Sequence, residues 1–409
     1  MEPEQAATEA MPYRWVMLGG AWLLYFCFGL TTGSLAPLVN VITGDLGLSH
    51  SAMGSILGAW PLVYIVSAVP CGAVLDRIGP RRALFMAGLI IALSGLLRGL
   101  APGYVSLFLA VALFGIGGPL ISVGGPKLVS LWFRDAERGL AMGIFATGPA
   151  LGVVTTLMLT NSVAMPLAGG NWRAVLMAYA ALVLLAALAW FVISARGAEP
   201  DANTVAGTKD AAPDQSQFQV FAGLLRLPAL RLVLATSIFI FFFNHGMNNW
   251  LPEILRTHGM DAATAGFWAA IPHAVGIVAA LVIPRLAGPA RRFIILGGLF
   301  LCAGVATLLI ESGTGPLLAA GLMLQGTARG AMSSVMLLVL MATPGVDART
   351  IGSASGLYFS AGEIGGVLGP LSVGYLFDVT GGFSTGLYLL TGITALMILM
   401  LTRLRALSR

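Results

Sequence analysis

The stretch GAVLDRIGPRR, residues 72–82, indicates how the whole chain is organised. It contains one acidic and three basic side chains, two glycines and a proline, and it lies at the junction of two apolar runs near 51–75 and 82–100. Each run has about the 20 residues that a helix needs to cross the hydrocarbon core of a bilayer. Charged and turn-forming residues between two such runs indicate a short loop that joins two membrane helices.

The composition of the chain excludes a soluble enzyme. Of 409 residues, 57% are hydrophobic and 10% are charged, and the mean hydropathy is +0.90, whereas a soluble domain carries about 25% charged residues. Cys27, Cys71 and Cys302 all lie in apolar runs and have no disulfide or metal-site spacing. There is no Walker loop, dinucleotide fingerprint or metal-spaced His/Cys set. We therefore expect no enzymatic activity, no cofactor and no metal.

Apolar runs of spanning length recur along the chain, which predicts an all-α integral membrane protein. We place twelve of them, near 15–39, 51–75, 82–100, 104–131, 139–163, 173–195, 229–254, 262–284, 292–311, 315–341, 350–376 and 384–402. The one long polar stretch lies between the sixth and seventh runs and reads as a flexible linker. The predicted organisation is a six-helix bundle at 1–195, a linker at 196–228 and a second six-helix bundle at 229–409.

The basic residues predict the orientation, because cytoplasmic loops carry an excess of Lys and Arg. If the amino terminus is cytoplasmic, 18 of the 22 basic residues fall on the inner side. Arg98, Arg173 and Arg256 lie near outer span ends, where long side chains can reach water, but Arg329 does not. This scatter also argues against a nucleic-acid partner. We expect an uncleaved, monomeric protein of the inner (plasma) membrane, with lipid around it and both termini in the cytoplasm.

Residues 72–82 resemble the signature G-x-x-x-D-R-x-G-R-R of the major facilitator superfamily. PRLAGPARR, residues 284–292, is similar to a degenerate copy that lacks the Asp. A second pair, GPALG at 148–152 and GEIGG at 362–366, has small residues that let helices approach closely. These small-residue segments either only pack helices together or also allow the helices to move against each other during transport. The resemblance implies two pseudo-symmetric six-helix bundles that carry a small molecule by alternating access.

Within that superfamily the chain is similar to the cyanate and nitroimidazole transporter group (cyanate permease-like). The strings that carry this resemblance are GLLRGLAP at 95–102, GPKLVSLWF at 125–133 and NWLP at 249–252. The superfamily resemblance also implies a cytoplasmic gate that holds the outward-facing state closed on the inside. Its candidate residues are Asp76, Arg77, Arg81, Arg82, Glu137 and Arg138.

Three ionisable side chains fall near mid-depth of their spans, where each needs a partner, an aqueous cavity or a function. Arg329 is suited to a carboxylate or another small anion, and the alternative is a structural ion pair with Glu363. Glu363 is a candidate proton carrier, or else a permanently paired carboxylate. His273 could bind substrate or relay a proton, or it could simply pack.

The stretch FFFNHGMNNW, residues 241–250, gathers amide and imidazole side chains that need partners inside the membrane. We expect Asn244, His245 and Asn248 to line the substrate path. Tyr25, Trp60 and Tyr64 could form the opposite wall, and a cage of such rings would suit a quaternary amine.

The leading hypothesis is a secondary transporter of a small organic or inorganic anion, carboxylate- or cyanate-like, that is proton-coupled or works by exchange. Because no ATPase motif is present, energy must come from a gradient. The alternatives are a drug or metabolite efflux proton antiporter, an amine or choline-like cation transporter, and a non-transporting sensor on the same scaffold.

Overall fold

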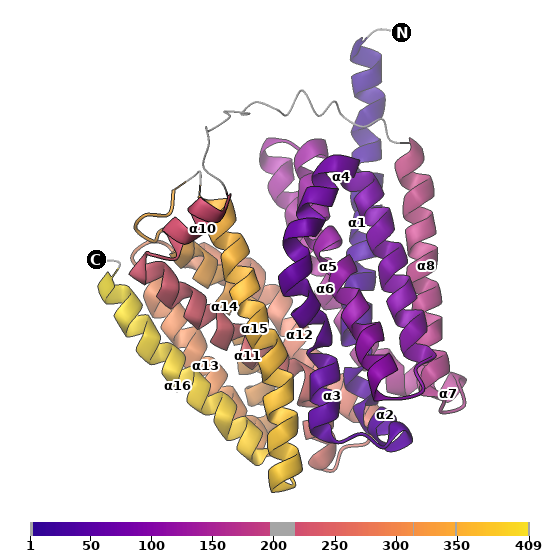
Figure 1. Cartoon of the computed structure of the whole chain (residues 1–409), viewed down its shortest axis with the longest axis vertical. Coiled ribbons are helices and arrows are strands. Elements are labelled where there is room, and N and C mark those ends of the chain that lie inside the picture. The colour runs from indigo at the N-terminus through magenta and orange to yellow at the C-terminus, as the bar shows by residue number, and fades with distance from the viewer. Residues whose placement is uncertain (1–2, 197–216, 314, 348–349, 408–409) are drawn as a thin grey trace.

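The computed structural model describes residues 3–196, 217–313, 315–347 and 350–407, and this part of the chain is helical without strands. Its helices form two bundles side by side, coloured indigo to magenta and red to yellow (Figure 1). The amino-terminal bundle comprises α1 (Pro3–Gly33), η1 (Ala36–Leu38), α2 (Val39–Leu46), α3 (His50–Leu57), α4 (Ala59–Gly99), α5 (Tyr104–Trp132), α6 (Asp135–Leu159), η2 (Thr160–Ala164), α7 (Met165–Leu167) and α8 (Trp172–Arg196).

The carboxy-terminal bundle comprises α11 (Pro228–Thr257), α12 (Ala262–Leu286), α13 (Arg292–Glu311), α14 (Gly315–Met341), α15 (Ile351–Thr380) and α16 (Ser384–Leu407). A further short helix, α10 (Gln217–Leu224), lies in the predicted linker, where the sequence indicated only a flexible segment. The rest of that linker, residues 197–216, lies outside the described residues. The predicted domain boundaries therefore stay predictions.

The twelve predicted spans are present, although they do not all look alike. Ten helical stretches of the described chain are long and apolar enough to cross a membrane. One of them, His50–Gly99, contains two spans because the backbone turns at Gly79, whose φ of 77° is a conformation that favours glycine. The remaining span is α15, whose many glycines and serines lower its hydropathy. Its length of 30 residues still lets it cross.

Glycine seams join equivalent helices in the two bundles. A Cβ at Gly152 of α6 would overlap the carbonyl oxygen of Phe26 on α1, and a Cβ at Gly365 of α15 would overlap that of Ile238 on α11. Spans one and five thus pack together as spans seven and eleven do, as expected for a duplicated chain. Each seam lies inside one bundle, so movement of one bundle against the other does not require either seam to slide.

The two bundles contact each other near the end that carries α2 and α3, which we call the closed end (Figure 1). A Cβ at Gly54 would overlap the carbonyl oxygen of Pro370 on α15. The side-chain amide of Asn161 donates to the carbonyl oxygen of Ala262 at 3.3 Å. These contacts pair α3 with α15, and η2, which follows α6, with α12.

A carboxylate of the second bundle caps a helix of the first at the closed end. Asp378 accepts hydrogen bonds from the backbone N–H groups of His50 and Ser51 at 2.9 and 2.8 Å, and from the Ser51 hydroxyl. These are the first N–H groups of α3, where negative charge is favoured. Partial burial would raise the pKa of Asp378, but the hydrogen bonds from Ser51 and His50 lower it to about 2.

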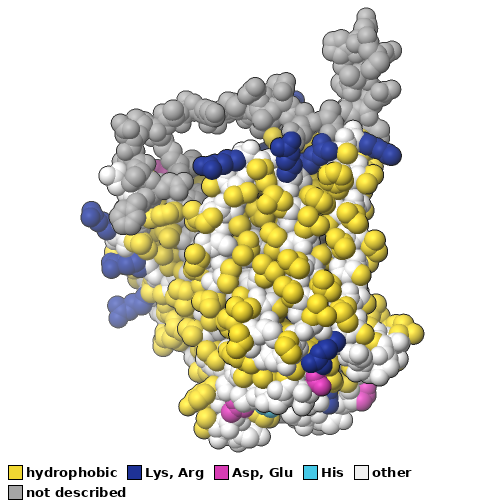
Figure 2. Space-filling model, turned by 45° about the vertical axis from the view of Figure 1, so that its right-hand side comes forward, with side chains coloured by type: hydrophobic (Ala, Val, Ile, Leu, Met, Phe, Trp, Pro, Cys, Tyr) yellow, Lys and Arg dark blue, Asp and Glu magenta, His cyan; other side chains and the backbone are white. Residues whose placement is uncertain are grey.

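The opposite end, which we call the basic end, carries the α4 turn, and Lys and Arg side chains gather there (Figure 2). Its ion pairs stay within the first bundle. Lys127 Nζ lies 2.6 Å from Asp76 Oδ1, and Arg14 Nη1 lies 2.8 Å from Glu137 Oε2. Among the described residues, no ion pair links the two bundles at this end.

Candidate functional site

Helical spacing gathers the polar side chains of α11 on one face. Phe241, Asn244, His245 and Asn248 are separated by three, four and seven residues, so they share a face of the helix. All four line a cavity of about 320 Å³. The intervening residues Phe242, Phe243, Gly246, Met247 and Trp250 are buried in the bundle. The structure thus brings Asn244, His245 and Asn248 to one cavity, and their role in lining the substrate path stays a prediction.

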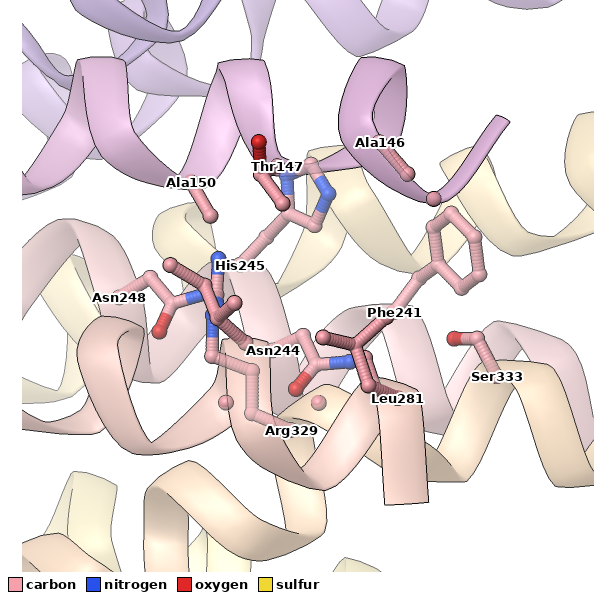
Figure 3. Close-up of a pocket in the computed structure, with 15 residues that line it drawn as sticks. Ala146, Thr147, Ala150, Phe241, Asn244, His245, Asn248, Leu281, Arg329 and Ser333 are labelled. Atoms are coloured by element: carbon pink, nitrogen blue, oxygen red, sulfur yellow. The ribbon is translucent and has the colours of Figure 1, made fainter. Parts of the chain in front are cut away.

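Arg329 enters this cavity from α14 and extends toward Asn248 and His245 (Figure 3). The neighbouring helix α12 leaves room for it, because a Cβ at Gly276 would lie 3.3 Å from Arg329 Nη1. The Nε of Arg329 is buried and has no hydrogen-bond partner. Within the described residues, no ion pair joins its guanidinium to a carboxylate. A buried cation without a counter-charge is costly.

A second cavity, of about 290 Å³, lies next to the first. The two share Ala146, Ala150, His245, Asn248 and Arg329 as lining residues, so we treat them as two lobes of one central cavity. Small residues of α6 form the wall of the first lobe opposite Arg329. Residues from α1, η1, α4 and α6 form most of the second lobe. The central cavity therefore lies between the two bundles, where a carried solute must sit in alternating access.

The polar groups around Arg329 are held in place by their neighbours. Gln325, one turn before Arg329 on α14, donates its amide to Asn248 Oδ1 at 3.3 Å. Asn249 donates its amide to the carbonyl oxygen of His245 at 2.9 Å. Asn244 Oδ1 is buried and has no partner. These contacts leave the Asn248 amide N–H groups free to point at a bound anion.

Glu363 does not pair with Arg329 in this structure. The carboxyl group on α15 is 6% exposed, and its Oε2 lies 3.8 Å from Nε2 of His245. A Cβ at Gly366 would lie 2.5 Å from the same oxygen, so the glycine leaves space for it. The ring of His245 is in turn 5.4 Å from that of Trp60 in the first bundle. Glu363 thus connects to the cavity through His245.

His273 of α12 lines the second lobe together with Arg329. Its side chain is buried, and Nδ1 lies 3.4 Å from the carbonyl oxygen of Ala269 one turn earlier. This placement is compatible with either of its predicted roles, substrate contact or packing.

The three predicted aromatic wall residues are placed differently. Trp60 lines the second lobe. Tyr25 stacks on Phe145 with ring centroids 4.5 Å apart, and the Tyr64 hydroxyl is 3.0 Å from that of Ser122. Neither tyrosine lines either lobe. The structure thus brings only one of the three rings to the cavity.

The predicted gate residues lie at the basic end. Asp76 and Glu137 form the ion pairs with Lys127 and Arg14 described above. Arg138 donates to the carbonyl oxygen of Ser130 at 3.4 Å, and Arg81 donates to the Ser194 hydroxyl at 3.2 Å. Arg77 and Arg82 are exposed. The gate role concerns a different conformation and stays a prediction.

Arg98 is a second buried arginine, and the expectation that it reaches water was wrong. It is 2% exposed. Its Nη1 donates to the carbonyl oxygen of Thr31 at 2.8 Å and to the Ser34 hydroxyl at 3.3 Å, and its guanidinium lies 5.4 Å from the Phe114 ring centroid. Thr31 is in the last turn of α1, whose carbonyl groups lack helical partners. Arg98 therefore caps the end of span one.

Sequence reasoning also missed three polar residues of the site. Ser333 and Thr147 line the first lobe, and Gln325 orients Asn248. Gln325 and Ser333 lie four residues before and after Arg329, so they share its helix face. That spacing would have identified them.

A solute-sized cavity between two duplicated bundles of membrane helices defines a transporter. The chain belongs to the Major Facilitator Superfamily, whose family model matches residues 21–370. It is therefore a multi-pass membrane transporter and not an enzyme.

Three relatives cover most of their own length and most of this chain. The uncharacterized transporter YycB of Bacillus subtilis is 28% identical and covers 94% of this chain and 91% of its own. A probable L-galactonate transporter of Escherichia coli is 26% identical (90% and 83%), and a putative tartrate transporter of Agrobacterium vitis is 25% identical (93% and 88%). Other relatives are named for hexuronate, for galactarate/D-glucarate and for quinolone resistance.

The relatives named for galactonate, tartrate, hexuronate and galactarate/D-glucarate are carriers of organic acids. They do not support the cyanate and nitroimidazole subgroup that the short strings indicated. The structure of the nucleoside transporter NupG matches with a TM-score of 0.79 at 13% identity, over 95% of this chain and 99% of that one. At that identity the likeness shows the fold alone.

Proposed function

We propose that this protein is a secondary transporter of a small organic anion and that Arg329 binds the anionic group. The observation that carries the proposal is the Arg329 guanidinium, which lines a cavity between the two bundles with a buried Nε that has no partner. A substrate carboxylate would supply the missing counter-charge through two parallel hydrogen bonds. The relatives named for galactonate, tartrate and hexuronate support this substrate class.

Residues of α11 complete the proposed anion site. The Asn248 amide, oriented by Gln325, lies beside the guanidinium, and the His245 ring extends into the same cavity toward α6 (Figure 3). They would donate to the second carboxylate oxygen or to a neighbouring polar group of the substrate. His273 would approach the same anion from the second lobe.

We further propose that Glu363 couples transport to protons. Its carboxyl group lies beside His245, which lines both lobes, so a proton and the substrate would act on the same imidazole. Glu363→Gln should abolish accumulation driven by a pH gradient while leaving exchange of internal for external substrate intact. Proteoliposomes with and without an imposed gradient measure both. Unchanged gradient-driven accumulation would instead favour simple exchange.

The proposed orientation places the basic end in the cytoplasm, with the protein a monomer in the inner membrane and both termini inside. The contacts at the closed end then make the described conformation inward-facing. In the outward-facing state, Asp76 and the nearby basic residues would close the basic end. Asp76→Asn should shift the protein further toward inward-facing states, and unchanged cytoplasmic accessibility of a reporter cysteine would argue against that gate.

Arg329→Ala tests the anion site directly. Loss of two charge-assisted hydrogen bonds, each contributing about 1.5–3 kcal/mol, should weaken carboxylate binding at least about 100-fold. Ligand-induced stabilisation of the purified protein measures this. Arg256→Ala is the matched control, because Arg256 lies on α11 near Glu253 and outside both lobes. Binding of wild-type strength in Arg329→Ala would disprove the assignment.

One relative, named for quinolone resistance in Acinetobacter baumannii, is 26% identical over 85% of this chain and favours drug efflux as a second candidate. Efflux predicts that the protein lowers dye accumulation in cells and that dyes compete with carboxylates for binding. An amine transporter would instead bind choline-like cations, which Arg329 would repel. Parallel assays with labelled acids, dyes and choline distinguish the three.

A further inference from the structure

We infer that the substrate is an amphipathic monocarboxylate, with one anionic end and an aromatic or branched aliphatic body, and not a polyhydroxylated sugar acid. The inference rests on the proposed function, because it assigns the carboxylate to Arg329. It goes further by assigning the body of the substrate to the second lobe. The evidence is the unequal distribution of polar groups around the cavity.

The charged and amide groups all lie on the carboxy-terminal side of the cavity. Arg329, Asn244, His245 and Asn248 come from α14 and α11. No acidic or basic side chain of the first bundle lines either lobe. Arg329 is therefore the only permanent cation among the lining residues, which suits one carboxylate. A second carboxylate, as in a dicarboxylic acid, would be left without a cation.

The wall from the first bundle is apolar and partly aromatic. Phe28, Trp60, Val153 and Leu157 line the second lobe from this side. Phe28 and Trp60 both pack against Phe114, which fixes the two rings. Such a wall stabilises an apolar body through burial of its surface and through ring stacking.

The two hydroxyl groups of this wall have no proton to give. Thr32 donates its hydroxyl to the carbonyl oxygen of Phe28 at 2.8 Å, and Thr147 donates to that of Ile144 at 2.7 Å. A threonine hydroxyl has a single proton. Thr147 also accepts a hydrogen bond from the Trp22 indole at 3.0 Å. Besides the Trp60 indole N–H, these are the only polar side-chain groups that α1, α4 and α6 bring to the lobes.

A polyhydroxylated acid would be poorly matched by this wall. Each of its hydroxyl groups loses water on entry, and each one left without a partner costs about 1–3 kcal/mol. An aromatic ring or a branched aliphatic chain has no hydroxyl group that would be left without a partner. Preference for the amphipathic acid over a hydroxylated acid of equal charge should therefore be at least about tenfold.

The test compares binding of phenylacetate, 3-phenylpropionate and 4-methylpentanoate with that of galactonate, glucuronate and tartrate. Thermal stabilisation of the purified wild-type protein gives relative affinities, and competition for uptake in proteoliposomes checks them. We expect the first three to bind at least about tenfold more tightly. Equal or tighter binding of galactonate or glucuronate would overturn this inference while leaving the anion-site proposal intact. Failure of every carboxylate, at millimolar concentration, would overturn both.

Two variants locate the body of the substrate. Val153→Asn adds an amide to the apolar wall and should reduce the preference for amphipathic over hydroxylated acids several-fold. Leu151→Asn, on the exposed side of the same helix, should leave that preference unchanged. Trp60→Leu should weaken phenylacetate binding about tenfold while leaving binding of propionate, which is too short to reach the ring, within twofold. If neither Val153→Asn nor Trp60→Leu changes the ratio of the affinities for amphipathic and hydroxylated acids in folded protein, the second lobe does not hold the substrate body.

Discussion

Arg98 and Arg329 are both arginines in membrane-spanning helices, one in each bundle, and both have a buried guanidinium nitrogen without a hydrogen-bond partner, yet their surroundings differ. Arg98 donates to a helix-terminal carbonyl and a hydroxyl and packs over Phe114. Arg329 lines both lobes of the central cavity, where a glycine keeps space beside it and its Nε stays unpartnered. Burial of a charge in a membrane protein therefore does not identify a binding site by itself. The discriminating feature is the cavity: Arg98 is packed against groups of its own bundle, whereas Arg329 lines a space that can hold a solute.

The largest expected effect on stability comes from Arg98→Ala. The variant leaves a cavity beside Phe114 and removes the hydrogen bonds that Arg98 donates to the Thr31 carbonyl and the Ser34 hydroxyl, so the free energy of unfolding should fall by about 3 kcal/mol. Arg98→Met should recover part of this because it refills the space. Thermal unfolding in detergent measures both. The matched Arg329→Ala variant should unfold within a few degrees of wild type, and a larger loss there than at Arg98 would break the comparison.

Crowding the guanidinium of Arg329 should have a smaller effect. In Gly276→Ala the new Cβ lies 3.3 Å from Nη1, so the side chain must shift by a few tenths of an ångström. Carboxylate affinity should fall about three- to tenfold, or about 1 kcal/mol. Gly298→Ala on α13 is the control, because a Cβ there meets nothing within 4 Å. Equal effects of the two substitutions would mean that Gly276 has no role in positioning Arg329.

The closed end provides a third kind of polar contact, partnered but exposed to solvent. Asp378 has a pKa of about 2, below its ordinary 3.8. Stabilisation from its ionised form is therefore complete above the ordinary value and is lost as the pH falls toward 2. Asp378→Asn should lower stability by about 1 kcal/mol at pH 6.

The difference in stability between Asp378→Asn and wild type should become smaller as the pH falls from 5 to 3. Thermal unfolding across that range measures this. Asp261→Asn serves as the control. Asp261 caps α12 within one bundle, and asparagine is an equally good cap. A difference between Asp378→Asn and wild type that grows on acidification would contradict the assigned contact.

Much of the fold was predictable for two reasons. The thickness of the bilayer sets the length of the apolar runs, and the cost of burying charge keeps ionisable residues out of them. The twelve spans followed from run length, and the scarcity of charge singled out Arg329 as a candidate, whose role stays a prediction. The role of Arg98 did not follow in this way, since counting residues from a span end gives depth but not the direction that a side chain faces. The same limit applied to Tyr25 and Tyr64, which face away from the lobes.

The sequence also could not show which groups the polar side chains pair with. The sequence offered Arg329 as the partner of Glu363, and only the packing of α15 against α11 places the carboxyl group beside the imidazole of His245 instead. Likewise, the sequence does not show whether the hydroxyl groups of Thr32 and Thr147 can donate to a ligand. Their protons are committed to carbonyl groups one turn earlier, a detail that depends on side-chain rotamer.

The glycine-rich α15 also bears on how the protein is made. Glycines let it lie directly against α11 and α3, but they leave it short of the hydropathy that marks the other spans. Both of those partner helices precede it in the chain and so leave the ribosome first. During biosynthesis α15 would thus meet a surface already assembled for it, and its membrane insertion would depend on that surface more than on its own affinity for lipid.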